Sequence, residues 1–142
     1  MDLIYTLDQT NEIAAQLVQQ YASKPVWVFQ APMGAGKTTL IAAIGKAMGI
    51  QEAMSSPTFS IMNEYQVQGK LIYHMDRYRL ENEADARQAG VEAALEEADI
   101  SLVEWPEKAA NLVPDNAVVM HIEILEPNRR RIYINQKMAS ME

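Results

Sequence analysis

The sequence of 142 residues predicts an α/β fold, in which a mixed central sheet carries helices on its faces. Three observations lead to this expectation. Short apolar runs are interspersed with helical segments, the connections include both parallel crossovers and hairpins, and a glycine-rich loop joins one apolar run to a helix. The length fits a single domain over residues 1–142, of which residues 136–142 are expected to form a frayed tail.

The N-terminal segment predicts a strand followed by a helix. Residues 3–7 form a short run suited to a strand, and the next residues, Asp-Gln-Thr-Asn, supply candidates for a helix N-cap. Large residues then recur four apart at Ile13, Leu17 and Tyr21, which is the spacing of one buried helix face.

A second strand and helix follow, joined by the glycine-rich loop. Residues 26–30, Val-Trp-Val-Phe-Gln, are typical of a strand buried on both faces. The loop Ala-Pro-Met-Gly-Ala-Gly comes next, and a helix is expected from about Lys37 to Met48, ending at Gly49. A strand, a glycine loop and a helix in this order are the context that a phosphate-binding loop requires.

The remaining chain predicts five strands and two short helices. The strands are expected at residues 59–65, 71–76, 100–105, 117–124 and 131–135. The first two should form an antiparallel pair, and the last two a hairpin around the turn Glu-Pro-Asn-Arg-Arg. Between these pairs, Gly90 divides a stretch rich in Ala and Glu, residues 83–98, into two helices.

Composition and charge argue against several classes of function. Acidic residues outnumber basic ones by 19 to 12, which disfavours direct binding to DNA or RNA. The main basic cluster, Arg129 to Arg131, is expected in a solvated turn or at a strand edge. The absence of cysteine and the presence of only two histidines argue against disulfides and zinc. Neither a membrane-spanning run nor a signal peptide is recognisable, so a cytoplasmic protein is expected.

The glycine-rich loop comes close to the Walker A pattern G-x-x-x-x-G-K-[ST], which binds nucleotide phosphates. In such a loop, backbone N–H groups hold the β-phosphate, Lys37 bridges the β- and γ-phosphates, and the Thr38 hydroxyl ligates Mg²⁺. Gly34 and Gly36 stand at the tightest part, whereas Ala31 replaces the first glycine. An alanine there can add backbone strain, but it removes neither a donor nor a charge, so nucleotide binding is expected to survive.

Two carboxylates are expected at the ends of buried strands, Asp76 after Leu-Ile-Tyr-His-Met and Glu104 after Ile-Ser-Leu-Val. Ligands of α/β folds bind at this edge of the sheet, where an acid can hold Mg²⁺ or its waters. For each acid alone, a solvated strand end is an equal alternative. His74 shares a strand face with Asp76, and we expect it to be a packed, hydrogen-bonded residue rather than a catalytic base.

Two further features accompany these acids. The segment Ser56, Pro57 and Thr58 could act as a loop that senses the nucleotide, or it could be an ordinary turn entering a strand. Trp105 directly follows Glu104 and lies either beside the nucleotide or in the core.

Four motifs, GAGKTT, SPTF, YHMDRYR and VEWPE, resemble in order and approximate spacing those of the TsaE (YjeE) family. Members of this family are small bacterial P-loop ATPases of the tRNA threonylcarbamoyladenosine pathway. The resemblance covers roughly residues 8–125 and implies a P-loop NTPase-like fold. Ala31 and Arg77 depart from the family pattern, which usually has glycine and an apolar residue at these positions.

The resemblance also implies roles for individual residues. Those that would contact the nucleotide are Thr10, Gly34, Ala35, Gly36, Lys37, Thr38, Thr39 and Trp105. Those implied in a switch-like loop are Ser56, Pro57 and Thr58. For catalysis the resemblance implies Lys37, Asp76 and Glu104, and we assign the attacking water to Asp76 and Mg²⁺ to Thr38 and Glu104, although the two acids could exchange roles.

The family works with two partners, TsaB and TsaD, and TsaD transfers the threonylcarbamoyl group to the adenosine beside the anticodon. The resemblance therefore implies ATP and Mg²⁺ as ligands, TsaB and TsaD as partners, and tRNA reached only through them. We expect an ATPase that is weak alone and activated by its partners.

Two other functions remain open from the sequence. One is a nucleotide-dependent binding switch with negligible turnover, which shares every phosphate contact with the ATPase. The other is a small P-loop kinase, in which Arg77, Arg79 and Arg87 would be recruited to a lid. A GTPase is disfavoured because the sequence has no [NT]-K-x-D motif.

Overall fold

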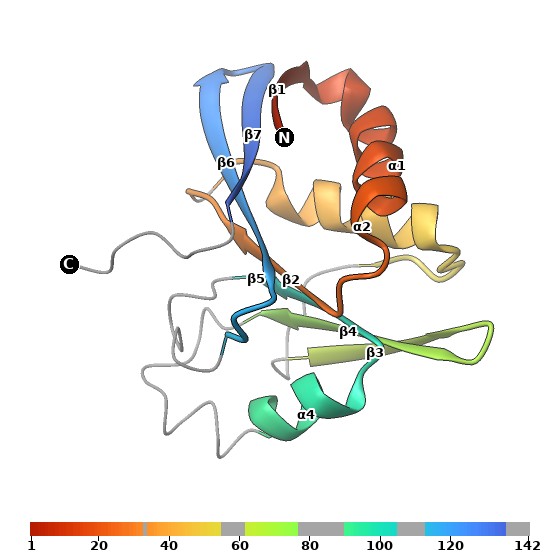
Figure 1. The fold of residues 1–142 in the computed structure, drawn as a ribbon. Coiled ribbons are helices and arrows are strands. Elements are labelled where there is room, and N and C mark those ends of the chain that lie inside the picture. The colour runs from red at the N-terminus through yellow and green to blue at the C-terminus, as the bar shows by residue number, and fades with distance from the viewer. Residues whose placement is uncertain (33, 55–61, 77–89, 105–112, 136–142) are drawn as a thin grey trace.

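A computed structural model describes residues 1–32, 34–54, 62–76, 90–104 and 113–135 of the chain. In these residues the chain forms a seven-stranded sheet with the strand order β1-β7-β6-β2-β5-β4-β3 (Figure 1). The central strands β6, β2, β5 and β4 are parallel, and the hairpin partners β7 and β3, together with β1, add antiparallel pairs on either side. The prediction of an α/β fold with a mixed sheet is confirmed.

The described elements have the following bounds. The strands are β1 (Asp2–Thr6), β2 (Val26–Gln30), β3 (Met62–Val67), β4 (Lys70–Asp76), β5 (Ile100–Glu104), β6 (Val118–Glu126) and β7 (Arg129–Asn135). The helices are α1 (Thr10–Tyr21), α2 (Lys37–Met48) and α4 (Val91–Glu97), and a short 3-10 helix, η1 (Leu7–Gln9), precedes α1. None of the helices in this described part is long and apolar enough to cross a membrane.

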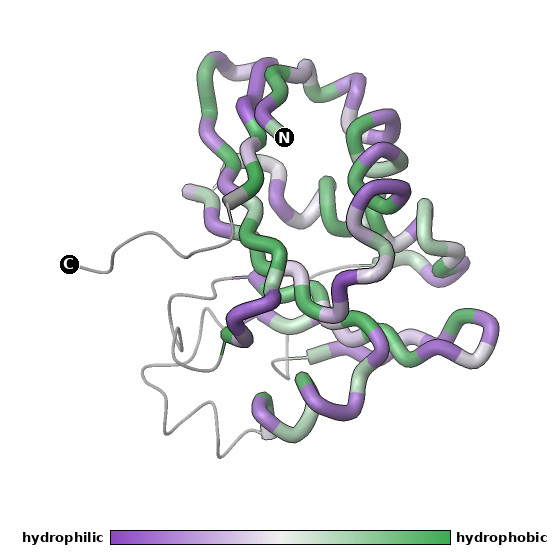
Figure 2. The backbone as a smooth tube through the Cα atoms, viewed as in Figure 1, coloured by the Kyte–Doolittle hydropathy of each residue, from purple (hydrophilic) through white to green (hydrophobic). Residues whose placement is uncertain are grey.

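Helices cover both faces of the sheet. Alternate residues of a strand point to opposite sides, and in β2 both sets are apolar, so each face needs a cover. On one face, Trp27 and Phe29 of β2 pack in a core with the apolar residues of α1 and α2. On the other, Val26 and Val28 pack in a second core with α4. Along α1, hydrophobic and hydrophilic residues alternate in Figure 2, as expected of a helix that buries one face.

In the N-terminal half, the observed element boundaries agree closely with those predicted from the sequence. Helix α2 spans the residues expected for it, and Gly49 follows in a left-handed conformation. Three expected features lie outside the described residues: the first part of the strand at 59–65, the helix before Gly90 and the tail 136–142.

The expectation for the basic cluster is wrong in one respect. Strand β7 begins at Arg129, so the three arginines lie in a strand between β1 and β6, and the hairpin turn consists of Pro127 and Asn128. Arg130 is buried rather than solvated, with 5% of its surface exposed. Its side chain shares a strand face with Ile132, which belongs to the main core.

The parallel strands bring the predicted site residues to one end of the sheet. In the strand register, Glu104 of β5 pairs with Phe29 of β2 on one side and with Asp76 of β4 on the other. Strand β2 ends at Gln30, the residue after Phe29, and the glycine loop connects it to α2. The loop, the start of α2 and both carboxylates are therefore neighbours at the carboxyl edge of the sheet.

Candidate functional site

Two glycines of the loop, Gly34 and Gly36, have backbone conformations that favour glycine. Gly34 and Gly36 adopt left-handed φ angles of +81° and +84°, which a residue with a Cβ adopts only with strain. Gly36 is the residue before α2, and its carbonyl accepts a helical hydrogen bond from Leu40 at 2.9 Å. The N-terminus of α2 thus directly follows the loop, and the partial positive charge at a helix N-terminus favours an anion.

The alanine at the first glycine position is not strained. Gln68 is the only non-glycine residue with a positive φ among the described residues, so Ala31 adopts an ordinary backbone conformation. Its side chain packs against the main core. The strain considered from the sequence is therefore absent.

Three residues from three elements meet at the start of α2. The Thr38 hydroxyl donates to Oε1 of Glu104 at 3.3 Å, and Nε2 of His74 lies 2.7 Å from Oε2 of the same carboxylate. His74 and Glu104 are buried, with side chains 1% and 2% exposed. This short distance identifies a hydrogen bond between the imidazole and the carboxylate. His74 is thus the packed, hydrogen-bonded residue that the sequence predicts.

Lys37 and the two threonines lie on the first turn of α2. The Lys37 side chain is buried, whereas Thr38 and Thr39 are exposed at the helix start. Asp76 is partly buried at the end of β4, directly beside Glu104 in the register. The structure therefore brings Lys37, Thr38, Asp76 and Glu104 to one end of the sheet, as predicted.

The N-terminal segment also reaches the loop. A Cβ built on Gly36 would lie 4.0 Å from Cδ2 of Leu7, so η1 passes next to the loop. Thr10 begins α1 three residues later, and its hydroxyl donates to the Leu7 carbonyl at 2.6 Å. This bond fixes the segment locally, and it occupies the hydroxyl hydrogen of Thr10.

Arg130 contacts the glycine loop, which was not expected from the sequence. Its Nε–H donates to the carbonyl of Ala35, inside the glycine loop, at 2.9 Å. Across the β1–β7 pair it lies opposite Tyr5, and burial raises the pKa of the Tyr5 hydroxyl while the charge of Arg130 opposes that rise. The sequence does contain a pattern that indicates burial of Arg130. It alternates with Ile132 and Ile134, and a period of two places all three on one strand face.

Four predicted site residues lie outside the described residues. They are Ser56, Pro57, Thr58 and Trp105.

The oxygen donors at the site suit Mg²⁺ held together with a nucleotide. Among the described residues there is no group of three or more His, Asp or Glu side chains that could hold a metal ion. The Thr38 hydroxyl and the Glu104 carboxylate form a pair of oxygen donors. Mg²⁺ typically takes one or two protein oxygens and completes its octahedron with phosphates and water, so two donors are sufficient.

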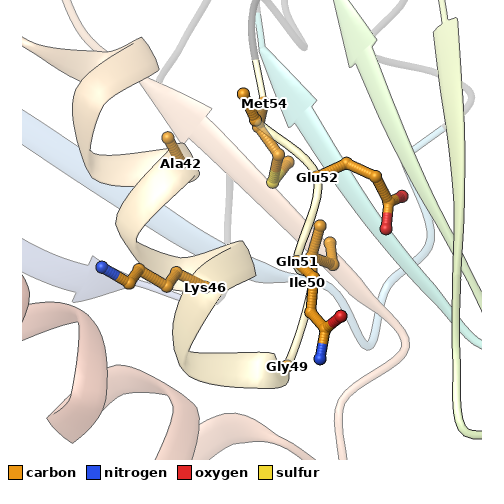
Figure 3. A pocket seen from close by; sticks show the side chains of 8 residues that line it. Ala42, Lys46, Gly49, Ile50, Gln51, Glu52 and Met54 are labelled. Atoms are coloured by element: carbon orange, nitrogen blue, oxygen red, sulfur yellow. The ribbon is translucent and has the colours of Figure 1, made fainter.

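A cavity of about 690 Å³ lies elsewhere, at the C-terminal end of α2. It is lined by Ala42 and Lys46 of α2 and by residues 49–54. In Figure 3 the side chains of Lys46 and Glu52 point away from each other, so their charged groups do not converge on one ligand. The cavity shares no residue with the glycine-loop site.

Comparisons with known proteins identify the family of this chain. Residues 4–132 match the family described as "Threonylcarbamoyl adenosine biosynthesis protein TsaE". The tRNA threonylcarbamoyladenosine biosynthesis protein TsaE of Aquifex aeolicus is 32% identical over 133 residues, covering 92% of this chain and 91% of the relative. The protein of the same name from Haemophilus influenzae is 31% identical over 120 residues, covering 84% and 76%.

The fold has a counterpart among solved structures. The crystal structure of Bacillus subtilis YdiB superposes with a TM-score of 0.70 at 24% identity, covering 94% of this chain and 84% of that one. At this identity the likeness concerns the fold alone. The family match, by contrast, extends over most of the sequence, and on that ground the chain belongs to the TsaE family of threonylcarbamoyl adenosine biosynthesis proteins.

Proposed function

We propose that the chain binds and hydrolyses ATP and thereby supports the threonylcarbamoylation of tRNA. The observation that carries this proposal is the contact between Thr38, at the start of the helix behind the glycine loop, and Glu104, at the end of the neighbouring parallel strand. A hydroxyl and a carboxylate in this relation are the two protein ligands that hold Mg²⁺ in P-loop nucleotide sites.

The loop and α2 would bind the phosphates. The N–H groups of Gly34 and Gly36 would face the β-phosphate, whereas the N–H of Ala35 donates to the Pro32 carbonyl at 3.2 Å. The helix N-terminus would add its partial positive charge. Lys37 would neutralise the β- and γ-phosphates. The exposed side chain of Thr39 would lie beside this cradle, and the segment that ends at Thr10 would approach the base.

The two acids would divide the remaining work. When bound, Mg²⁺ would neutralise charge on the phosphates during transfer of the γ-phosphoryl group. Glu104 is the better candidate for its ligand because it already contacts Thr38 and is held from the other side by His74. Asp76, next to Glu104 in the register, would orient the attacking water and accept its proton.

The family supports the proposed protein partners, and the net charge of the chain supports an indirect contact with tRNA. We propose that the protein acts in the cytoplasm with TsaB and TsaD, and that these partners hold the tRNA. Its net charge of −7 supports an indirect relation to tRNA, since phosphate binding needs clustered cations. Two of the three clustered arginines are engaged with carboxylates, Arg129 with Glu126 and Arg131 with Asp2 and Glu123.

The test is ATP binding and hydrolysis by the purified chain, alone and mixed with the TsaB–TsaD pair of the same organism. Lys37→Ala removes the phosphate-binding charge, and Lys46→Ala, at the exposed far end of the same helix, is its matched control. We expect hydrolysis that the partners stimulate, that Lys37→Ala abolishes and that Lys46→Ala leaves unchanged. ATP binding without turnover in either condition would favour a binding switch, and absence of ATP binding would overturn the proposal.

A further inference from the structure

Arg130 connects the β6–β7 hairpin to the glycine loop. It is the second residue of β7, and its guanidinium group points into the protein, where Nε–H donates to the Ala35 carbonyl at 2.9 Å. Ala35 lies between the two left-handed glycines and is itself 1% exposed. The two residues are 95 positions apart in the sequence, so this is a tertiary contact with the loop.

The guanidinium group is fixed on its other side by the hairpin turn. Nη1 donates to the carbonyls of Glu126 at 2.8 Å, Arg129 at 3.0 Å and Pro127 at 3.3 Å. A planar guanidinium held by several acceptors has little freedom to rotate, unlike the ammonium group of a lysine. The hairpin therefore presents the Nε–H donor to the loop in a defined direction.

The direction of this donor determines where a loop N–H group points. The carbonyl of Ala35 and the N–H of Gly36 belong to the same peptide unit, which is planar and trans, so they point in opposite directions. When Arg130 holds the carbonyl on the hairpin side, the Gly36 N–H faces away from the hairpin. Rotation of this peptide is otherwise easy on one side, because Gly36 tolerates many backbone angles.

Arg130 also differs from the neighbouring arginines in the partners of its charged group. Arg129 pairs with Glu126, and Arg131 pairs with Asp2 and Glu123. Within the described residues, the partners of Arg130 are main-chain carbonyls and no carboxylate contacts it. A buried cation without an ionic partner is unfavourable, and an anion bound at the adjacent loop would relieve this penalty.

We propose that Arg130 is a positioning residue for the nucleotide phosphates. It orients the Ala35–Gly36 peptide so that the Gly36 N–H faces the phosphate, and its charge adds to the positive potential behind the loop. This inference rests on the proposed function, since it concerns the affinity of the same loop for ATP.

The test compares Arg130→Met with Arg129→Met. Both changes remove one positive charge from β7, but the Arg129 side chain pairs with Glu126 at the surface, and among the described residues no hydrogen bond joins it to the loop. We expect Arg130→Met to weaken ATP binding by about tenfold or more, the effect of losing one charge-assisted hydrogen bond. Arg129→Met should stay within about twofold of the natural chain, since exposed pairs contribute little.

Two further measurements separate positioning from a structural role alone. The amide ¹⁵N chemical shift of Gly36 without nucleotide should change in Arg130→Met, because the bond to the Ala35 carbonyl polarises the same peptide unit, and should stay unchanged in Arg129→Met. If Arg130→Met binds ATP within twofold of the natural chain, even with lowered stability, the proposal is overturned. Should Arg130→Met fail to fold, Arg130→Lys decides, because it keeps the charge without the planar group: affinity reduced threefold or more supports positioning, and unchanged affinity refutes it.

The proposed function and this inference fail in different ways. A natural chain that binds no ATP overturns both. A natural chain that binds ATP, with Lys37→Ala inactive and Arg130→Met unaffected, overturns the inference alone.

Discussion

Nε2 of His74 lies 2.7 Å from Oε2 of Glu104, and both side chains are almost completely buried. The bond occupies one oxygen of the carboxylate while the other contacts Thr38. Glu104 is therefore held from two sides. Carboxylates that ligate metals are commonly oriented by such a second hydrogen bond.

Replacing His74 should affect both stability and the metal. His74→Ala leaves a buried carboxylate oxygen without its donor, which costs about 1–3 kcal/mol of unfolding free energy. Urea denaturation checks this value, and titration of ATP with and without Mg²⁺ checks the metal. We expect Mg²⁺ to improve ATP binding less in the variant. His74→Gln, whose amide can donate, should restore part of both effects; if it behaves as His74→Ala does, the hydrogen bond is not the cause.

Replacing each acid by its amide should show that Glu104 and Asp76 have different roles. Glu104→Gln keeps the size of the side chain but removes the charge, so Mg²⁺-dependent ATP binding should weaken by about tenfold, the loss of one charge-assisted contact. Asp76→Asn should leave this binding intact and reduce turnover by about a hundredfold or more, the usual contribution of a general base. Isothermal titration and a phosphate-release assay measure the two effects. The reverse pattern would show that the acids exchange roles.

Much of this site follows from local sequence, and the remainder depends on tertiary contacts. The bounds of α2 were predictable because a glycine stands at each end, and the acids because each follows an apolar run. The His74–Glu104 bond requires that β4 and β5 be neighbours in a particular register, which no local pattern specifies. The sequence predicts Arg130 in a solvated turn or at a strand edge because charged residues are usually exposed, whereas strand alternation places it in the core.

Ala31→Gly should have little effect on the nucleotide. Ala31 has an ordinary φ, so glycine relieves no strain there, and the lost methyl packing and added chain entropy should lower stability by up to about 1 kcal/mol. Gly34→Ala is the contrasting change. A Cβ there meets no atom within 4 Å, yet the left-handed φ of +81° costs about 1–2 kcal/mol. Urea denaturation of both variants measures the two losses of stability. ATP titration of Ala31→Gly tests the expectation on nucleotide binding, and tighter binding would contradict it.

Asp2 should contribute stability that acid removes. Hydrogen bonds from Arg131 at 2.7 and 3.0 Å hold the pKa of Asp2 below its ordinary value of 3.8. A pKa lowered in the folded state means that the stabilisation is present above about pH 3.8 and is lost as the pH falls through the folded-state value. Asp2→Asn should therefore be slightly less stable than the natural chain at pH 6, and this difference should shrink as the pH falls below 3.8. Urea unfolding across this range tests it, with the exposed Asp115→Asn as control.

Gly45 should resist replacement although it lies in a helix. Alanine is normally favoured over glycine in a helix interior by about 1 kcal/mol. Here the sulfur of Met54 occupies the position where a Cβ would lie, and Cδ1 of Ile50 is 3.2 Å away. Forcing a methyl group into this contact costs about 1–3 kcal/mol, so Gly45→Ala should lower the unfolding free energy in the natural chain.

The sign of this effect should depend on Met54. In a Met54→Ala background the sulfur is gone, so Gly45→Ala should become neutral or stabilising, and the two changes should be non-additive by about 1 kcal/mol or more. Urea denaturation of the four proteins in this cycle measures the coupling. Additive effects would mean that Met54 moves aside freely and does not hold the segment after α2 against the helix. Strong coupling would mean that the helix carrying Lys37 and Thr38 at its start also fixes residues 50–54 at its end.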